Sequence, residues 1–292
     1  MSTATTRRSA RRHLTAAAAG AVAVGLGVAG APAQAAPVAP TVLLPNIVVA
    51  EGDSGPAGFV VNVGLSAPNP FNHAVSLEVV DYTAVQLPGG GTYGTATPGT
   101  DYVAFPSFDL VFQPGQQVAR FTVAIKGDTA IEPSEEIDVR FDDTEFFVGD
   151  NDIDLVIGND DTGAAKTKKP LLLPPNQTMP EPDSGCFDYR VTVPLSKPAK
   201  LRSTVDAEDY SAVPLPPPLT GTYGTASPGS DYVGFGSRTL TYPSGKRVSN
   251  LPITICGDTT AEGDEEVDVR FDNTTTIAVT DNDIDLVLAN ED

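Results

Sequence analysis

Tryptophan is absent from this sequence, and only two cysteines and two histidines occur among its 292 residues. His73 is the only histidine after residue 35, and no serine or cysteine nucleophile pattern accompanies it. So few nitrogen and sulfur ligands argue against a zinc site. Paired carboxylates can hydrolyse glycosides, but such enzymes also need aromatic platforms for the sugar. We therefore expect no catalytic residues and no enzyme, with an extracellular glycoside hydrolase as a remote alternative.

Positive charge is also scarce. The chain has 18 lysines and arginines against 38 acidic residues, which gives a net charge of −20 at pH 7. A chain this acidic repels nucleic acid and anionic membranes and attracts cations. Acidity that only keeps a secreted protein soluble is a simpler explanation of the total, but it does not explain where the acids lie. We expect no nucleic-acid partner.

Long apolar runs are absent except for residues 16–30, which consist almost wholly of alanine, glycine, valine and leucine. Arginines precede this run, and a small-residue pattern ends it at Ala35. The order of basic, apolar and small residues predicts a signal peptide over residues 1–35, too short and too weakly apolar for a stable membrane span. Arg11-Arg12 resembles a twin-arginine motif, with an ordinary secretory signal as the alternative. We expect a secreted, extracellular protein without a stable membrane anchor.

Internal repetition, by contrast, is abundant. The stretch Thr92–Tyr102 recurs almost unchanged as Thr222–Tyr232, and other blocks recur at nearly the same offset. A long repeat of this kind indicates two copies of one module. Residues 41–161 form the first predicted domain, and residues 171–292 form the second. Residues 162–170, which are small and basic and end in a proline, form the predicted linker.

Apolar residues alternate with polar ones inside each copy. The clearest segments of the first copy are Phe121–Ile125, Ile137–Phe141 and Ile153–Ile157, and the second copy repeats the pattern. A period of two predicts half-buried β-strands, and turn residues separate them. No segment after residue 35 has the helical spacing of apolar residues. We therefore predict an all-β protein with two tandem immunoglobulin-like antiparallel β-sandwiches.

A series of acidic and glycine-containing blocks occurs in the same order in both copies. In the first copy the blocks are Glu51-Gly52-Asp53, Gly94-Thr95-Ala96, Gly99-Thr100-Asp101-Tyr102, Pro114-Gly115, the loop from Gly127 to Glu135, and Asn159-Asp160-Asp161. This series resembles the Calx-beta domain family. Members of that family occur in sodium–calcium exchangers, in integrin subunits and in bacterial adhesins. The resemblance implies a β-sandwich with a calcium site at one end.

The resemblance also implies which acidic residues bind calcium. In the first copy they are Glu51, Asp128, Glu132, Glu135, Asp160 and Asp161. In the second copy they are Glu181, Asp258, Glu262, Glu265, Glu291 and Asp292. The sequence departs from the family where an expected aspartate is Tyr93 or Tyr223, because a phenol is a poor calcium ligand. Asn159 offers only an amide oxygen, and we interpret Asp101 and Asp231 as turn residues before a core tyrosine.

Charge repulsion gives a separate reason to expect a cation. If the sandwich brings Glu51, Glu132 and Asp161 to one rim, each pair of carboxylates about 4 Å apart costs about 1–4 kcal/mol. Calcium removes this repulsion and accepts about 6–8 oxygen ligands in a tolerant geometry, whereas magnesium demands a stricter one and is the second choice. A rim without metal, whose acids stay apart and hydrated, is the alternative.

The two cysteines lie beside rim blocks of the second copy. Cys186 follows the opening acidic block, and Cys256 immediately precedes Gly257-Asp258. The first copy has Pro56 and Lys126 at these positions. Because an exported protein can form disulfides, we expect a Cys186–Cys256 bond, with two free thiols as the alternative.

Two function classes follow for the whole chain. The leading one is a secreted calcium-binding protein with a role in adhesion, extracellular interaction or structure, and its partner is an unidentified extracellular protein or surface. The other is a metal-free Calx-beta-like interaction scaffold. In that case the proline- and glycine-rich insertions at residues 85–91 and 213–219 contact the partner; they could equally supply oxygens to the rim or cover it.

Overall fold

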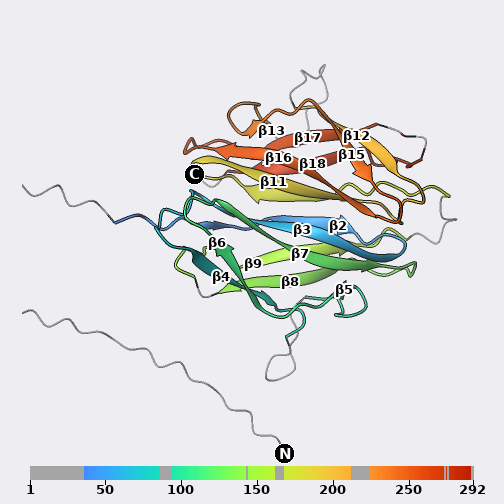
Figure 1. Ribbon diagram of the computed structural model, residues 1–292, viewed down its shortest axis with the longest axis horizontal. Coiled ribbons are helices and arrows are strands. Elements are labelled where there is room, and N and C mark those ends of the chain that lie inside the picture. The colour runs from blue at the N-terminus through green and yellow to red at the C-terminus, as the bar shows by residue number, and fades with distance from the viewer. Residues whose placement is uncertain are drawn as a thin grey trace, which may run out of the picture. The chain divides into compact units, whose positions relative to one another are not determined.

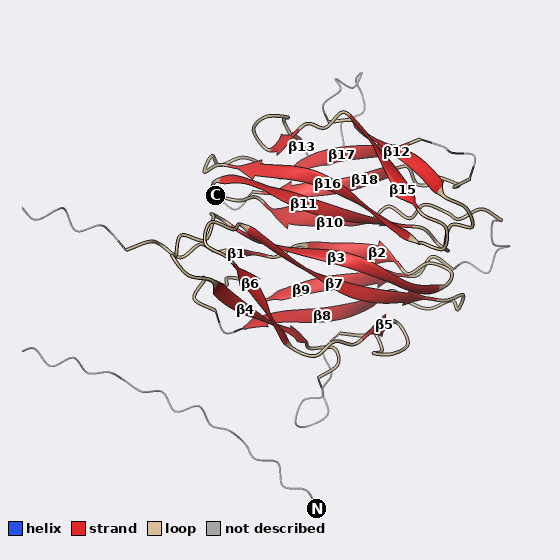
Figure 2. Cartoon of the chain, in the orientation of Figure 1, coloured by secondary structure: helices blue, strands red, loops and turns tan. Residues whose placement is uncertain are grey.

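The fold is built from β-strands alone in the part of the chain that the structure describes. The structure is a computed structural model that describes residues 36–85, 94–142, 144–161, 168–211, 224–272, 274 and 276–290. These residues include no helix long and apolar enough to cross a membrane. Figure 2 shows strands and loops only, which confirms the predicted all-β class.

Several sequence predictions concern residues outside these ranges. They are the signal peptide, most of both insertions, most of the linker, Tyr93, Tyr223, Glu291 and Asp292. All of them stay predictions.

Residues 41–161, called copy one below, form two sheets with a shared core. The smaller sheet has the order β1-β3-β7-β5, and the larger has the order β2-β9-β8-β4-β6. The strands are β1 (Val42–Leu43), β2 (Asn46–Ala50), β3 (Gly55–Leu65), β4 (Val75–Asp81), β5 (Tyr102–Val103), β6 (Phe108–Phe112), β7 (Val118–Gly127), β8 (Glu135–Asp142) and β9 (Asp152–Gly158).

Residues from 171 onward, called copy two, repeat this arrangement. The smaller sheet has the order β11-β16-β14, and the larger has the order β10-β18-β17-β12-β15 with β13 beside β17. The strands are β10 (Asn176–Pro180), β11 (Gly185–Pro194), β12 (Ser203–Asp209), β13 (Gly224–Thr225), β14 (Tyr232–Val233), β15 (Ser237–Tyr242), β16 (Val248–Gly257), β17 (Glu265–Phe271) and β18 (Asp283–Ala289).

Alternation along the strands explains where the core lies. On β7, Phe121, Val123 and Ile125 are buried while Thr122 between them is exposed, because successive side chains point to opposite faces of a strand. The buried faces of both sheets of copy one form one hydrophobic cluster, and copy two has its own. The two predicted β-sandwiches are therefore confirmed.

A buried tyrosine fixes the turn that carries Asp101. The Tyr102 side chain is fully buried, and its hydroxyl donates a hydrogen bond to Asp81 Oδ1 over 2.9 Å. Asp101 Oδ2 accepts a hydrogen bond from the Thr97 N–H over 2.5 Å. In copy two, the Tyr232 hydroxyl donates the equivalent hydrogen bond to Asp209 Oδ1 over 2.8 Å. Both predicted roles, a turn aspartate and a core tyrosine, are present.

The two copies contact each other through equivalent positions. Strand β2 pairs antiparallel with β10, its counterpart in copy two, which joins the two larger sheets into one 11-stranded sheet. Figure 1 labels β2, and Figure 2 labels both strands. Between β3 and β11, the Val60 N–H donates to Thr192 Oγ1 over 2.9 Å and the Arg190 N–H donates to Asn62 Oδ1 over 3.0 Å. Val60 and Arg190 occupy the same position in the two copies, as do Asn62 and Thr192. The contact therefore has approximate two-fold symmetry.

Candidate metal centre

Three segments of copy one converge at one end of its sandwich. Parallel pairing of β2 with β9 brings Glu51 beside the residues that follow β9, and the Gly52 N–H donates to Asp160 Oδ1 over 2.7 Å. The third segment is the loop of residues 128–134 between β7 and β8. Gly127, immediately before this loop, packs against the Glu51 and Gly52 carbonyl groups, with no room for a Cβ atom. Residues distant in the sequence thus meet at one rim.

Acidic side chains from these segments form two overlapping groups. Glu51, Asp128 and Glu132 make up the first group, and Asp101, Glu132 and Glu135 make up the second. In each group, one carboxylate oxygen of every residue lies within 4.8 Å of the others, and Glu132 belongs to both. Carboxylates this close repel one another unless a proton or a cation lies between them.

Glu51 is the buried member of the first group. The residue is 5% exposed, and its Oε1 atom has no hydrogen-bond partner. Burial raises the pKa of Glu51 to about 7, and the negative charges of Asp128, Asp160 and Glu132 act in the same direction. A buried carboxylate oxygen without a partner is unfavourable. The site therefore favours a positive charge, a proton or a metal ion, beside this atom.

The second group holds Glu135 in a similar state. Burial raises the pKa of Glu135 to about 7, and the hydrogen bond to Asp101 together with the charges of Asp101 and Glu132 adds to the effect. A small cavity lies between the two groups. Its lining includes Glu51, Asp101, Glu132, Glu135, Ile157 and Asn159.

Asn159 stabilises the loop of residues 128–134, called the acidic loop of copy one below. Its side-chain Nδ2 donates to the carbonyl oxygens of Glu132 over 2.7 Å and Ala130 over 3.3 Å. Asp128 Oδ1 closes the start of the same loop by accepting a hydrogen bond from the Ala130 N–H over 2.6 Å. The sequence suggested only an amide oxygen as the contribution of Asn159. The structure adds a positioning role for its amide nitrogen.

Among the residues that the structure describes, copy two has a smaller cluster at its corresponding end. Asp231, Glu262 and Glu265 form a group with the same 4.8 Å spacing. Burial raises the pKa of Glu265 to about 7, and a hydrogen bond to Asp231 and the charges of Asp231, Glu262 and Glu181 contribute. Asp258 Oδ1 accepts a hydrogen bond from the Thr260 N–H over 2.6 Å, which repeats the loop closure of copy one.

The predicted ligands divide into those that gather and those that do not. The groups contain Glu51, Asp128, Glu132, Glu135, Glu262 and Glu265. Among the described residues, Asp160, Asp161, Glu181 and Asp258 lie outside them. Asp160 nevertheless lies close enough to Glu51 to raise its pKa, and Asp161 is buried at the same end of the sandwich.

Asp101 and Asp231 are site residues that the sequence interpretation missed. The sequence favours a turn role for both, yet each belongs to a carboxylate group. They join the rim because β5 and β14 pair with β7 and β16, the strands that lead into the acidic loops. The signal in the sequence was their recurrence in both copies beside a buried tyrosine.

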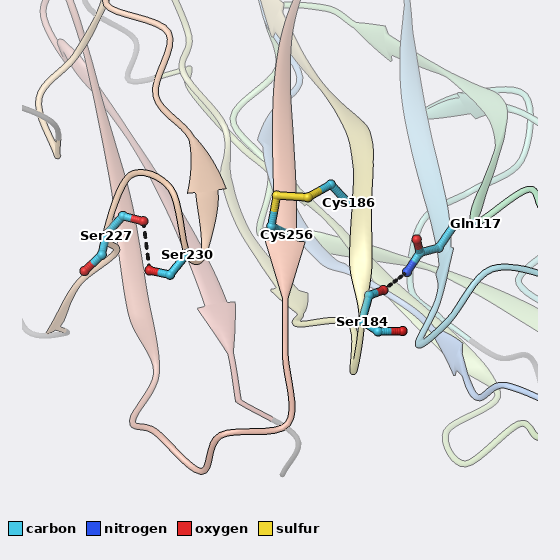
Figure 3. Close-up of a disulfide and its surroundings, with 6 residues drawn as sticks. All are labelled: Gln117, Ser184, Cys186, Ser227, Ser230 and Cys256. Carbon is cyan, nitrogen blue, oxygen red and sulfur yellow. Dashed lines mark hydrogen bonds between the residues drawn. A yellow bond between two sulfur atoms is a disulfide. The ribbon is translucent and has the colours of Figure 1, made fainter.

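The cysteines form the predicted disulfide. Cys186 on β11 and Cys256 on β16 are direct partners in the antiparallel register and are bonded to each other (Figure 3). The bond lies one residue from Gly257, where the acidic loop of copy two begins. Copy one pairs Pro56 with Lys126 at the same place. The covalent link is therefore particular to copy two.

The donors at these rims are oxygen atoms of carboxylates. Such donors suit hard cations, whereas zinc and copper prefer nitrogen and sulfur ligands. The residues present thus fit a hard divalent cation, and the unpartnered Glu51 Oε1 atom is the structural observation on which that fit rests.

A tandem pair of β-sandwiches with an acidic rim on each defines the class of this protein. The sequence pattern of the Calx-beta domain matches residues 74–164 and residues 202–291, together more than half of the chain. The chain belongs to the Calx-beta domain family, as its acidic blocks indicate. No curated protein matches it.

The solved structures that are similar to this chain include three crystal structures. The crystal structure of CBD12 from CALX1.2 is 15% identical, with a TM-score of 0.32, and the match covers 83% of this chain and 99% of that one. The crystal structure of the calcium binding domain CBD12 of CALX1.1 is 17% identical, with a TM-score of 0.31 and coverage of 78% and 80%. The apo form of the Calx CBD1 domain is 20% identical, with a TM-score of 0.28 and coverage of 40% and 99%.

Proposed function

We propose that this protein binds calcium at the acidic rim of copy one and also at that of copy two, where fewer ligands gather among the described residues. The observation that carries the proposal is the buried Oε1 atom of Glu51, which has no hydrogen-bond partner. Glu51 belongs to a group of three carboxylates. Calcium accepts about 6–8 oxygen ligands in a flexible geometry, and a group of carboxylates supplies such oxygens. Membership of the Calx-beta family agrees with this choice of ion.

Each group of carboxylates supplies a different set of proposed calcium ligands. Glu51, Asp128 and Glu132 would hold one ion, and Glu132 would bridge to Asp101 and Glu135. In copy two, Asp231, Glu262 and Glu265 would hold the ion. Calcium would relieve the repulsion among these carboxylates, and its binding to the folded state alone would stabilise the fold.

Thermal unfolding tests the calcium proposal. Calcium at millimolar concentration should raise the melting temperature, and a chelator should reverse the rise. The double variant Asp128→Ala, Glu132→Ala should lose the part of the rise that belongs to copy one. An identical melting temperature with calcium and with chelator would contradict calcium binding.

We also propose that the protein is exported and acts outside the cell in adhesion or matrix contact. The basic–apolar–small order of residues 1–35 supports export, and so does the Cys186–Cys256 disulfide, because such bonds persist in oxidising compartments. Mass spectrometry of the protein from the culture medium should find an N-terminus just after Ala35. Full-length protein retained in the cytosol would contradict export.

A further inference from the structure

Copy two reaches the acidic rim of copy one with one buried arginine. Arg247 lies in the turn before β16 and is 4% exposed. Its Nη1 atom donates to Ser54 O over 2.9 Å and to Gly55 O over 2.6 Å, and its Nη2 atom donates to Glu51 O. Its Nε atom donates to Leu195 O of its own copy over 2.7 Å. One guanidinium thus binds both the start and the end of residues 51–55.

The loop of residues 51–55, called the opening loop below, is shaped to receive this side chain. Gly52 has a φ of 78°, and a Cβ atom there would overlap Arg247 Nη2. The Asp53 N–H donates across the same contact to Ser196 O over 2.6 Å. The opening loop is therefore fixed on copy two through its backbone. Its Glu51 side chain remains in the carboxylate group of copy one.

Nearby carboxylates favour the charged form of the buried Arg247 side chain. Burial lowers the pKa of Arg247, and the charges of Asp160, Asp53 and Glu51 oppose that effect. The hydrogen bonds described above go to backbone carbonyl oxygens, so the guanidinium leaves the carboxylate oxygens of Glu51 available to a cation. Lysine carries its three donors on a single nitrogen, whereas arginine spreads five over a planar fork, so a lysine at this position should lose part of this contact.

The equivalent contact, from copy one to the opening loop of copy two, is weaker. Gln117 occupies the position of Arg247 in copy one, and its Nε2 atom donates to Ser184 O over 2.7 Å, a bond drawn in Figure 3. Gln117 is neutral, and the opening loop of copy two has Pro182 where copy one has Gly52. The two-fold symmetry of the contact therefore breaks at the rims.

We propose that Arg247 is a positioning residue for the cation site of copy one, so that this site is complete only when copy two is docked against it. Four hydrogen bonds, the fit at Gly52 and the link to Ser196 carry this inference. It rests on the proposed function for the identity of the ion, but the effect of Arg247 on the opening loop can be measured without calcium.

Calcium titration by calorimetry tests the effect on the site. The background variant Glu262→Gln, Glu265→Gln removes two of the three carboxylates that gather in copy two, so that the heat reports copy one. In that background, Arg247→Gln and Arg247→Lys should each weaken calcium binding about tenfold, the effect expected for losing one or two hydrogen bonds to a charged group. Arg238→Gln is the matched control, because it removes one arginine charge from copy two at a side chain bonded to Pro252 O, and it should leave the affinity unchanged.

Hydrogen exchange in a chelator tests the effect on the loop. Arg247→Gln should speed exchange of the Gly52 and Asp53 amides, which donate to Asp160 and Ser196. Arg238→Gln should not, and circular dichroism should confirm that both variants are folded.

Each other outcome counts against the proposal or against the proposed function. Unchanged exchange at Gly52 and Asp53 would overturn the positioning role, whatever calcium does. Tighter binding in Arg247→Gln together with wild-type binding in Arg247→Lys would also overturn it, because the arginine would then act only by repelling the cation. If the wild-type protein gives no heat with calcium, the proposed function fails, and the exchange experiment still decides the role of Arg247.

Discussion

Glu51 links the physical chemistry of one residue to the proposed site. The sequence placed it among the calcium ligands through the acidic block Glu51-Gly52-Asp53. Its burial and its pKa of about 7 follow from loops that only the tertiary fold brings together. The sequence did not place Asp101 among the ligands, because its neighbours Glu132 and Glu135 come from a distant part of the chain.

Replacing Glu51 by glutamine should separate the charge of this residue from its shape. Glu51→Gln keeps the volume and removes a buried negative charge, so it should raise the unfolding free energy in a chelator by up to about 3 kcal/mol near pH 8. It should also weaken calcium binding. Asp109→Asn, an exposed charge on β6, is the control and should change neither quantity. Urea denaturation measures the first effect, and a loss of stability in Glu51→Gln would contradict the assigned cause.

Acid should stabilise the protein when calcium is absent. The pKa values of Glu51, Glu135 and Glu265 rise from 4.5 to about 7 in the folded state, so the folded protein binds more protons than the unfolded chain between these pH values. Unfolding free energy therefore falls as the pH rises from about 4.5 to 7. Melting temperatures measured in a chelator should increase on acidification from about pH 8 to pH 5. Calcium should stabilise most at the higher pH, where protons no longer compete for these carboxylates.

A melting temperature in chelator that falls steadily on acidification across this window would contradict the raised pKa values.

At the scale of elements, the strands were the most predictable feature. The alternation over Phe121–Ile125, Ile137–Phe141 and Ile153–Ile157 gave β7, β8 and β9, because half-buried strands need a period of two. The pairing of β2 with β10 was not predictable. Edge strands pair through backbone groups that every sequence carries, so side-chain patterning says little about which edges meet.

The disulfide between β11 and β16 should stabilise the protein measurably. The double variant Cys186→Ser, Cys256→Ser should lower the unfolding free energy by about 2–4 kcal/mol, because the bond closes a loop with a sequence separation of 70. Urea denaturation of the oxidised wild type, the reduced wild type and the variant should give one high midpoint and two lower, similar ones. Equal midpoints for all three would mean that the bond adds no stability or does not form.

At the scale of the whole molecule, duplication explains both the symmetry and its failure. Two similar modules meet through equivalent residues on β2 and β10 and on β3 and β11. The rims differ in sequence, because Arg247 of copy two stands at the position of Gln117 in copy one, and Cys256 stands at the position of Lys126. The sequence predicted two modules with the same kind of site. It could not predict that one module reaches into the rim of the other, since that depends on how the two pack.

The most direct test of calcium binding is anomalous X-ray diffraction from crystals of residues 36–292 grown with calcium. We expect a calcium peak among Glu51, Asp128 and Glu132, with ligand oxygens at about 2.3–2.6 Å. A well-ordered rim without such a peak, in crystals that hold millimolar calcium, would contradict the proposed site.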